Sequence, residues 1–179
     1  MLPSERRRYI QSNSMARNIC LSDIACKIQS SIISARLLEH LSEVGIENQF
    51  GCIPKKGCID ALFCIRNALH IRKQHDLDTW AIFIDLVKAF DTADHEMLLK
   101  ILERYGVPQQ MLKVIKKLYT DTIVVLKIGK EKREIKYEVG VKQGDTMAPV
   151  LFIYLMNAFA ETLKKNWDVE TLQYKWFPE

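Results

Sequence analysis

The chain has 179 residues, of which 48% are hydrophobic and 27% are charged, and its formal net charge is +4. This length and balance predict one globular domain, or two small lobes that share a core. They exclude a disordered tail, a fibrous repeat and a small disulfide-stabilised protein. The mild excess of basic side chains is compatible with a nucleic-acid partner but is too small to identify one by itself.

The five cysteines form no C-x-x-C pair, and three of them recur at six-residue spacing, unlike the ligands of a zinc ribbon. We therefore expect reduced thiols in an intracellular protein, nuclear or cytoplasmic, with metal binding as the alternative. The polar start with Arg6, Arg7 and Arg8 is not typical of a secretory signal. The longest apolar run, 149–156, is far shorter than the ~20 residues of a membrane span, so we expect no membrane partner.

The first half of the chain begins with a polar segment, 1–21, and continues into a domain that we place at 22–165. Apolar residues at helical spacing predict a helix over 22–45 and a second over 60–72, joined by a Gly- and Lys-containing loop. The run Trp80–Ile84 is continuously apolar, which predicts a central strand buried on both faces.

The second half predicts two helices, a hairpin and a buried helix before a tail, 166–179. Leu98–Leu102 mark the third helix, and Pro108 suits the first turn of a fourth that reaches Tyr119. Runs at 122–128 and 134–139 flank a glycine turn and predict a hairpin with one solvent-exposed face. The helix over 147–164 begins apolar all round and should be buried.

Asp85, at the end of the predicted strand, is the first candidate functional residue, because metal-binding acids often project from strand ends. A cap for the following segment explains it equally well. His95 is a candidate ligand or base, but it fits better in the first turn of a helix capped by Asp94.

Two other segments are candidates for binding phosphates. The loop 140–145 carries Lys142 and Gln143 between glycines, so its backbone can approach a flat or phosphorylated ligand, although such loops are commonly plain turns. Lys55 and Lys56, with Arg66 and Arg72 downstream, form a basic group whose default interpretation is a solvated face.

Together these segments resemble the reverse transcriptases of non-long-terminal-repeat retrotransposons and group II introns, over about 17–164. The segment from Phe83 to His95 is similar to the family's first catalytic block, and 141–152 is similar to its nucleotide-contacting block. The segment 49–62 is similar to the fingers block, and 17–37 to the block before it. Four blocks in the correct order make the resemblance specific.

The resemblance implies an α+β fold: the helical fingers and a partial palm of a right-hand polymerase, with helices packed on a small antiparallel sheet. It implies RNA-templated DNA synthesis from dNTPs with two Mg²⁺ ions, an RNA template and a DNA primer. Asp85 would be the catalytic metal ligand, with the Leu86 carbonyl beside it. Phe90, Gln143, Gly144, Lys55 and Lys56 would contact the nucleotide, and Lys55, Lys56, Arg66 and Lys142 the nucleic acid. Without the resemblance, Phe90 is a core aromatic.

The sequence departs from the family's pattern in three ways. Asp145 replaces a small residue, and lysines replace arginines at 55, 56 and 142, which keeps the charge but loses bidentate geometry. The paired-aspartate block is missing, because no Asp-Asp occurs in the sequence. We therefore expect this chain to be a truncated part of a reverse transcriptase, inactive alone; a non-catalytic nucleic-acid-binding remnant is the alternative, and an unrelated Mg²⁺-dependent nucleotidyl transferase ranks third.

Overall fold

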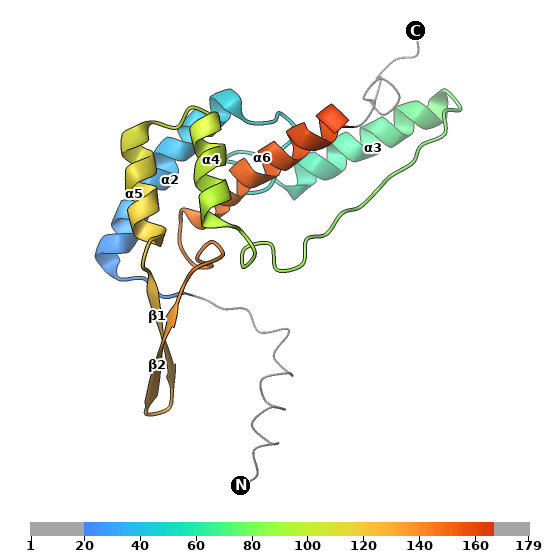
Figure 1. Cartoon of the computed structure of the whole chain (residues 1–179). Coiled ribbons are helices and arrows are strands. Elements are labelled where there is room, and N and C mark those ends of the chain that lie inside the picture. Colours follow the sequence, from blue (N-terminus) through green and yellow to red (C-terminus); the bar gives the residue numbers. More distant parts are fainter. Residues whose placement is uncertain (1–19, 167–179) are drawn as a thin grey trace.

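The computed structural model describes residues 20–166, so the segments predicted at 1–21 and 166–179 lie almost entirely outside the described residues (Figure 1). The described part has five helices and one hairpin. In chain order these are α2 (Ile24–Val44), α3 (Cys58–Gln74), α4 (His95–Arg104), α5 (Gln109–Tyr119), β1 (Ile123–Ile128), β2 (Glu131–Lys136) and α6 (Ala148–Asn166). The helices thus form where the sequence predicts them, within a few residues at each end.

Side chains at the helix starts explain these positions. The Asp23 carboxylate accepts a hydrogen bond from the Cys26 N–H at 2.8 Å, and the Asp94 carboxylate accepts one from Met97 at 2.7 Å. Both satisfy amides that the first helical turn leaves without a partner. At the start of α3 the arrangement is reversed, because the Gly57 N–H donates to the Asp60 carboxylate.

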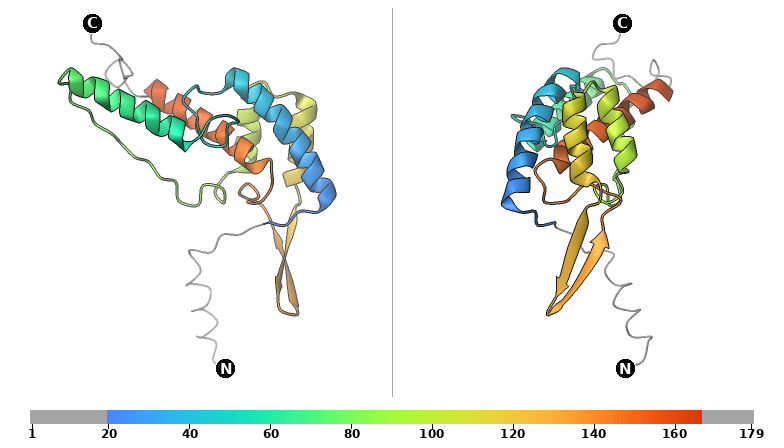
Figure 2. Two further views of the ribbon diagram at one scale, coloured as in Figure 1. Left: turned by 180° about the vertical axis from the view of Figure 1, so that it is seen from behind. Right: turned by 60° about the vertical axis from the view of Figure 1, so that its left-hand side comes forward.

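The hydrophobic core lies between α6 and the three helices α2, α4 and α5 (Figure 2). Helices α2 and α4 both pack on α6, and α5 packs on α4. Tyr154 of α6 is fully buried, and its hydroxyl donates to the Leu37 carbonyl of α2 at 3.2 Å. The first half of α6 is therefore the buried helix that the apolar run predicts.

The central strand predicted at 80–84 is wrong for this structure. These residues are extended but unpaired, and Trp80 and Phe83 are 93% and 89% exposed. A strand needs neighbours for its backbone groups, and one that is apolar on both faces also needs a layer on each side. Among residues 20–166 the only sheet is the two-stranded hairpin, whose strands pair with each other and leave none for this segment.

The hairpin projects from the helices as an antiparallel ribbon (Figures 1 and 2). Its return strand ends at Lys136 rather than 139, and every residue of β2 is exposed. The prediction of a single solvent-exposed face is therefore wrong, since both faces of β2 meet solvent. A helical layer with a separate antiparallel hairpin is an α+β fold, as the sequence predicted.

Helix α3 forms as predicted but buries none of its residues. Leu62, Ile65 and Leu69, on its predicted apolar face, are between 46% and 59% exposed. An amphipathic pattern therefore specified the helix without supplying a surface for its apolar side to cover. No helix within residues 20–166 is long and apolar enough to cross a membrane.

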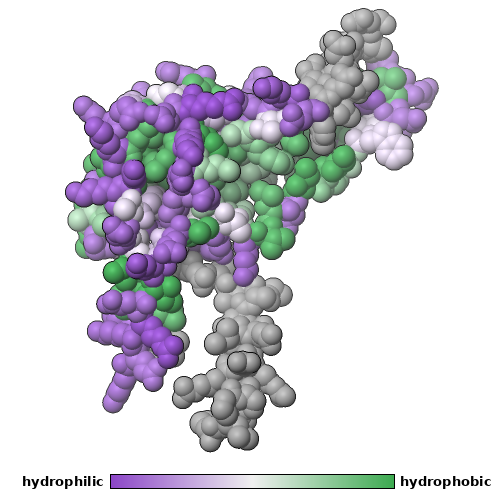
Figure 3. All heavy atoms as spheres, viewed as in Figure 1, coloured by the Kyte–Doolittle hydropathy of each residue, from purple (hydrophilic) through white to green (hydrophobic). Residues whose placement is uncertain are grey.

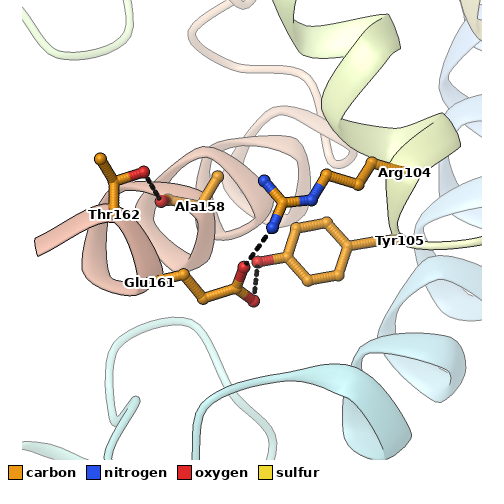
Figure 4. Close-up of polar contacts among 5 residues, drawn as sticks. All are labelled: Arg104, Tyr105, Ala158, Glu161 and Thr162. Atoms are coloured by element: carbon orange, nitrogen blue, oxygen red, sulfur yellow. Dashed lines mark hydrogen bonds and ion pairs between the residues drawn. The ribbon is translucent and has the colours of Figure 1, made fainter. Parts of the chain in front are cut away.

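Glu161 of α6 holds the end of α4 through two contacts (Figure 4). The Tyr105 hydroxyl donates to its carboxylate at 2.5 Å, and the Arg104 guanidinium lies 3.2 Å from its other oxygen. We expect Tyr105→Phe to lower the free energy of unfolding by about 1–2 kcal/mol, because the bond joins a half-buried hydroxyl to a carboxylate. Urea denaturation at neutral pH measures the loss.

Arg104→Gln is the matched control, because removing this exposed ion pair should cost less than about 1 kcal/mol. Burial, and then the Glu161 carboxylate, raise the pKa of Tyr105 above its ordinary 10.0. The stabilisation is therefore complete below about pH 10 and is lost as the pH rises through the folded-state pKa. The difference in stability between wild type and Tyr105→Phe should shrink at high pH, and a constant difference would contradict this assignment.

Candidate nucleotide and nucleic-acid site

The turn that follows Asp85 is docked directly on the loop that follows the hairpin. The Val141 N–H donates to the Phe90 carbonyl and the Gly140 N–H donates to the Ala93 carbonyl, both at 2.7 Å. Asp94 and Val139 form an isolated antiparallel bridge beside them. These contacts bring together two sequence blocks that lie about fifty residues apart in the chain.

Gly140 makes this close approach possible. Its φ is +96°, and a Cβ added there would lie 2.9 Å from the Phe90 carbonyl oxygen and 3.0 Å from that of Asp91. It would also meet the Tyr137 hydroxyl at 2.9 Å. Only glycine adopts that backbone angle readily and has no Cβ to collide with these oxygen atoms. The sequence marked Gly140 as a loop residue, but the contact that requires it is visible only in the folded chain.

His95 takes part in this docking contact. It lies in the first turn of α4, as one of its two predicted roles requires, and its Nε2 is 2.6 Å from the Gly140 carbonyl oxygen. Its ring also packs edge-on against Tyr119 at 5.0 Å between centroids. These contacts hold the imidazole between α4, α5 and the loop.

The loop 140–145 presents Gln143 and Gly144 while its other polar side chains hold it in place. The Lys142 ammonium donates to the Leu118 carbonyl at 2.8 Å and lies 5.2 Å from the Tyr119 ring centre. Gln143 is half-buried, and Gly144 is exposed with a φ of +103°. The loop can therefore present backbone and an amide side chain to a ligand, with the Lys142 charge anchored at its edge.

Asp145, the departure from the family's pattern, has a structural role. Its side chain is buried and accepts a hydrogen bond from the Met147 N–H at 3.4 Å, at the start of α6. A carboxylate at this end of a helix is stabilised by the exposed amides and the helix dipole. The signal was present in the sequence, as an aspartate just before a long apolar run, but its role as a helix-start residue was missed.

Three protonated groups surround the docked loop. Burial is the main cause that raises the pKa of Tyr137 to about 12, with Cys20 and Asp91 adding to it. Burial also raises the pKa of the Tyr119 hydroxyl and of the Cys20 thiol, although Lys142 opposes the shift at Cys20. At neutral pH these groups therefore keep their protons.

Phe90 lies at the junction of the turn and the core. Its ring stacks on Phe152 of α6 with centroids 4.9 Å apart, and it packs against the buried cluster. The side chain is half-buried, so part of the ring still meets solvent. The geometry accommodates both interpretations from the sequence, a packing aromatic and a surface for a sugar.

Asp85 and Leu86 lie in the extended, exposed segment before this turn. Mg²⁺ takes six oxygen ligands in near-octahedral geometry. Within residues 20–166 no three His, Cys, Asp or Glu side chains come together as a metal group, so one carboxylate and one carbonyl do not make a complete site. All five cysteines are free, and Cys52, Cys58 and Cys64 are exposed.

Of the basic residues predicted to contact the nucleic acid, only Lys142 belongs to the docked loop 140–145. Lys55 is exposed with a φ of +64°, while the Lys56 ammonium donates to the Glu47 carbonyl and lies 5.6 Å from the Phe50 ring centre. Arg66 is exposed on α3. In the described part of the chain no hydrogen bond or ring contact joins these three residues to the loop 140–145.

Comparison with known proteins identifies the family. Residues 10–175 match the family described as reverse transcriptase (RNA-dependent DNA polymerase). The chain is 29% identical over 151 residues to the transposon TX1 uncharacterized 149 kDa protein of Xenopus laevis, covering 84% of this chain and 12% of that protein. It is 26% identical over 148 residues to the Pol polyprotein of the Drosophila melanogaster type-2 retrotransposable element R2DM, covering 82% and 14%.

A shorter match, 36% over 84 residues, is to the Pol polyprotein of the type-1 retrotransposable element R2 of Nasonia vitripennis, covering 46% of this chain and 8% of that protein. The chain thus spans less than a seventh of each of these relatives. The family match nevertheless covers more than half of the chain and includes both docked blocks. The chain belongs to the reverse transcriptase (RNA-dependent DNA polymerase) family.

Proposed function

We propose that this chain forms the fingers and front palm of a reverse transcriptase domain and contributes its nucleotide-side contacts to RNA-templated DNA synthesis. The observation that carries the proposal is the pair of hydrogen bonds from the loop 140–141 to the turn carrying Phe90 and Ala93. These bonds join the two sequence blocks that contain Asp85 and Gln143, which supports a nucleotide site shared between the blocks.

Each residue then has a proposed role. The Gln143 amide and the exposed backbone at Gly144 would line the incoming dNTP, and the outward part of the Phe90 ring would lie under its sugar. Lys55, Lys56, Arg66 and Lys142 would contact phosphates of the RNA template and DNA primer, a largely sequence-independent interaction. Asp85 and the Leu86 carbonyl would be ligands to Mg²⁺, which stabilises charge at the transferring phosphoryl group in this reaction class.

A photo-crosslinking experiment tests the proposal. The full chain is mixed with an RNA template, a DNA primer and an azide-bearing dNTP and is then irradiated. Crosslinked peptides should map to 85–91 and 141–144, and Gln143→Ala should reduce the second set several-fold. The same mixture should show no primer extension, because the sequence has no Asp-Asp and one carboxylate cannot hold two Mg²⁺ ions.

Gln29→Ala, an exposed change on α2, is the control and should leave the crosslinks unchanged. Crosslinks spread evenly over the chain, or equal in wild type and Gln143→Ala, would contradict the nucleotide assignment. Primer extension that Asp85→Ala abolishes would contradict the expected inactivity.

A further inference from the structure

The β1–β2 hairpin carries a concentration of exposed cations that the proposed nucleotide site does not use. Residues 127–136 contain five basic and two acidic side chains. The hairpin extends away from the helical layer, and Figure 3 shows its outer half covered by hydrophilic residues, with apolar ones nearer the helices. The two ion pairs in the described part of the chain join residues of α4 and α6, so neither neutralises the hairpin.

The pairing register places two of these cations directly opposite each other. Lys127 pairs with Lys132, and Lys136 lies on the same face, four residues along β2, with Glu134 between Lys132 and Lys136. Like charges at directly opposed positions destabilise a ribbon. The free protein therefore bears an electrostatic cost at this pair, and a bound anion lying along that face would relieve it.

A groove connects the hairpin with the candidate nucleotide site. It has a volume of about 690 Å³, and its lining includes Lys127 from the hairpin and Lys142 from the loop 140–145. Two carboxylates also line it, but each is already held at the start of a helix. Asp23 accepts from the Cys26 N–H and Asp145 from the Met147 N–H. The lining of the groove thus balances two lysines with two aspartates, and the excess of positive charge lies on the exposed hairpin.

We propose that the hairpin is a nucleic-acid-binding arm, in which Lys127 and Lys132 neutralise backbone phosphates of the template–primer duplex whose end lies at the loop 140–145. Lys130, at the turn, extends the same positive surface. Contacts of this kind position a duplex without reading its sequence. The inference rests on the proposed function for the identity of the ligand, but its site is separate from the nucleotide contacts.

The test measures binding of the full chain to a 5′-labelled RNA–DNA heteroduplex by fluorescence anisotropy across a KCl series. Each phosphate neutralised contributes about 0.9 to the slope of log affinity against log salt, so Lys127→Gln/Lys132→Gln should reduce the slope by about 1.8. Lys164→Gln/Lys165→Gln, which removes the same charge from the exposed end of α6, is the matched control and should leave the slope unchanged.

A second variant separates binding from folding. Lys127→Glu creates an opposite-charge pair with Lys132, so the melting temperature should stay the same or rise while heteroduplex affinity falls. A structural role for Lys127 would lower both quantities together. A lower affinity with an unchanged or higher melting temperature therefore supports a binding arm.

The outcomes distinguish this inference from the proposed function. The hairpin inference alone would be overturned if the wild type binds heteroduplex and forms the mapped dNTP crosslinks, but the hairpin variant and the α6 variant have equal salt slopes. Wild type that binds no heteroduplex would overturn both. Binding to phosphatidylserine vesicles without binding to heteroduplex would assign the hairpin to an anionic membrane surface and would also overturn the inference.

Discussion

Gly140→Ala is expected to lower the free energy of unfolding by about 3–5 kcal/mol. A non-glycine residue at φ +96° costs about 1–3 kcal/mol, and the new Cβ would press on two carbonyl oxygens at 2.9–3.0 Å. The turn would have to move away, which would break the hydrogen bonds from Gly140 and Val141 at about 0.5–1.5 kcal/mol each. Urea denaturation measures the stability.

Gly129→Ala is the matched control for this change. Gly129 also has a positive φ, +61°, but a Cβ there would meet nothing within 4 Å. It should therefore show only the backbone cost of about 1–2 kcal/mol. The Gly140 variant should in addition lose the dNTP crosslinks at 141–144, since the loop no longer docks beside Phe90. Equal losses of stability in the two variants would show that the docking contact contributes nothing.

Phe90→Ala is expected to cost about 2–4 kcal/mol, somewhat less than a fully buried phenylalanine because the ring is half-exposed. About 0.5–1.5 kcal/mol of this is the stacked pair with Phe152. Phe152→Ala removes the same pair from the other side, and a double-mutant cycle with the two alanine variants isolates the pair's contribution. Thermal or urea unfolding of the full chain gives these values.

The sugar-facing role of Phe90 needs a second measurement, in an active domain made by joining this chain to the remaining palm and thumb of a relative. If the ring excludes a 2′-hydroxyl, Phe90→Val should raise kcat/KM for rCTP relative to dCTP, about tenfold for each 1.4 kcal/mol of clash removed. Phe152→Val should weaken packing but leave this ratio unchanged. An unchanged ratio in Phe90→Val, with a large fall in melting temperature, would assign Phe90 to packing alone.

Local sequence signals predicted the helices well because their causes are local. Asp23 and Asp94 cap helices within three residues of themselves, and the apolar spacing of α4, α5 and α6 needs only the periodicity of a helix. Turn chemistry likewise placed the hairpin at Gly129, although its length and solvent exposure differed from the prediction. The order of the motifs along the chain was enough to predict the family, which the comparisons confirm.

The candidate site depended on contacts that no local pattern contains. Nothing near Gly140 in the sequence shows that the carbonyl oxygens of Phe90 and Asp91 would lie against it. The roles of the residues in the loop 140–145 likewise follow from packing against α5 and α6. Lys142 and Asp145 bond to neighbouring backbone groups. Gln143 and Gly144 are thereby left for a ligand. The roles of Asp85, Phe90 and the predicted phosphate-binding residues stay predictions until the experiments above are done.

The sequence by itself determined the helices, the caps at Asp23 and Asp94, the hairpin turn and the family, because each follows from residues close together or from their order in the chain. Only the tertiary structure decided that 80–84 remains unpaired and that two distant blocks meet at Gly140. The physical reason is the same in both cases. Strand pairing and docking are interactions between segments far apart in the sequence, and a residue's own neighbours in the chain do not specify whether its partner is in place.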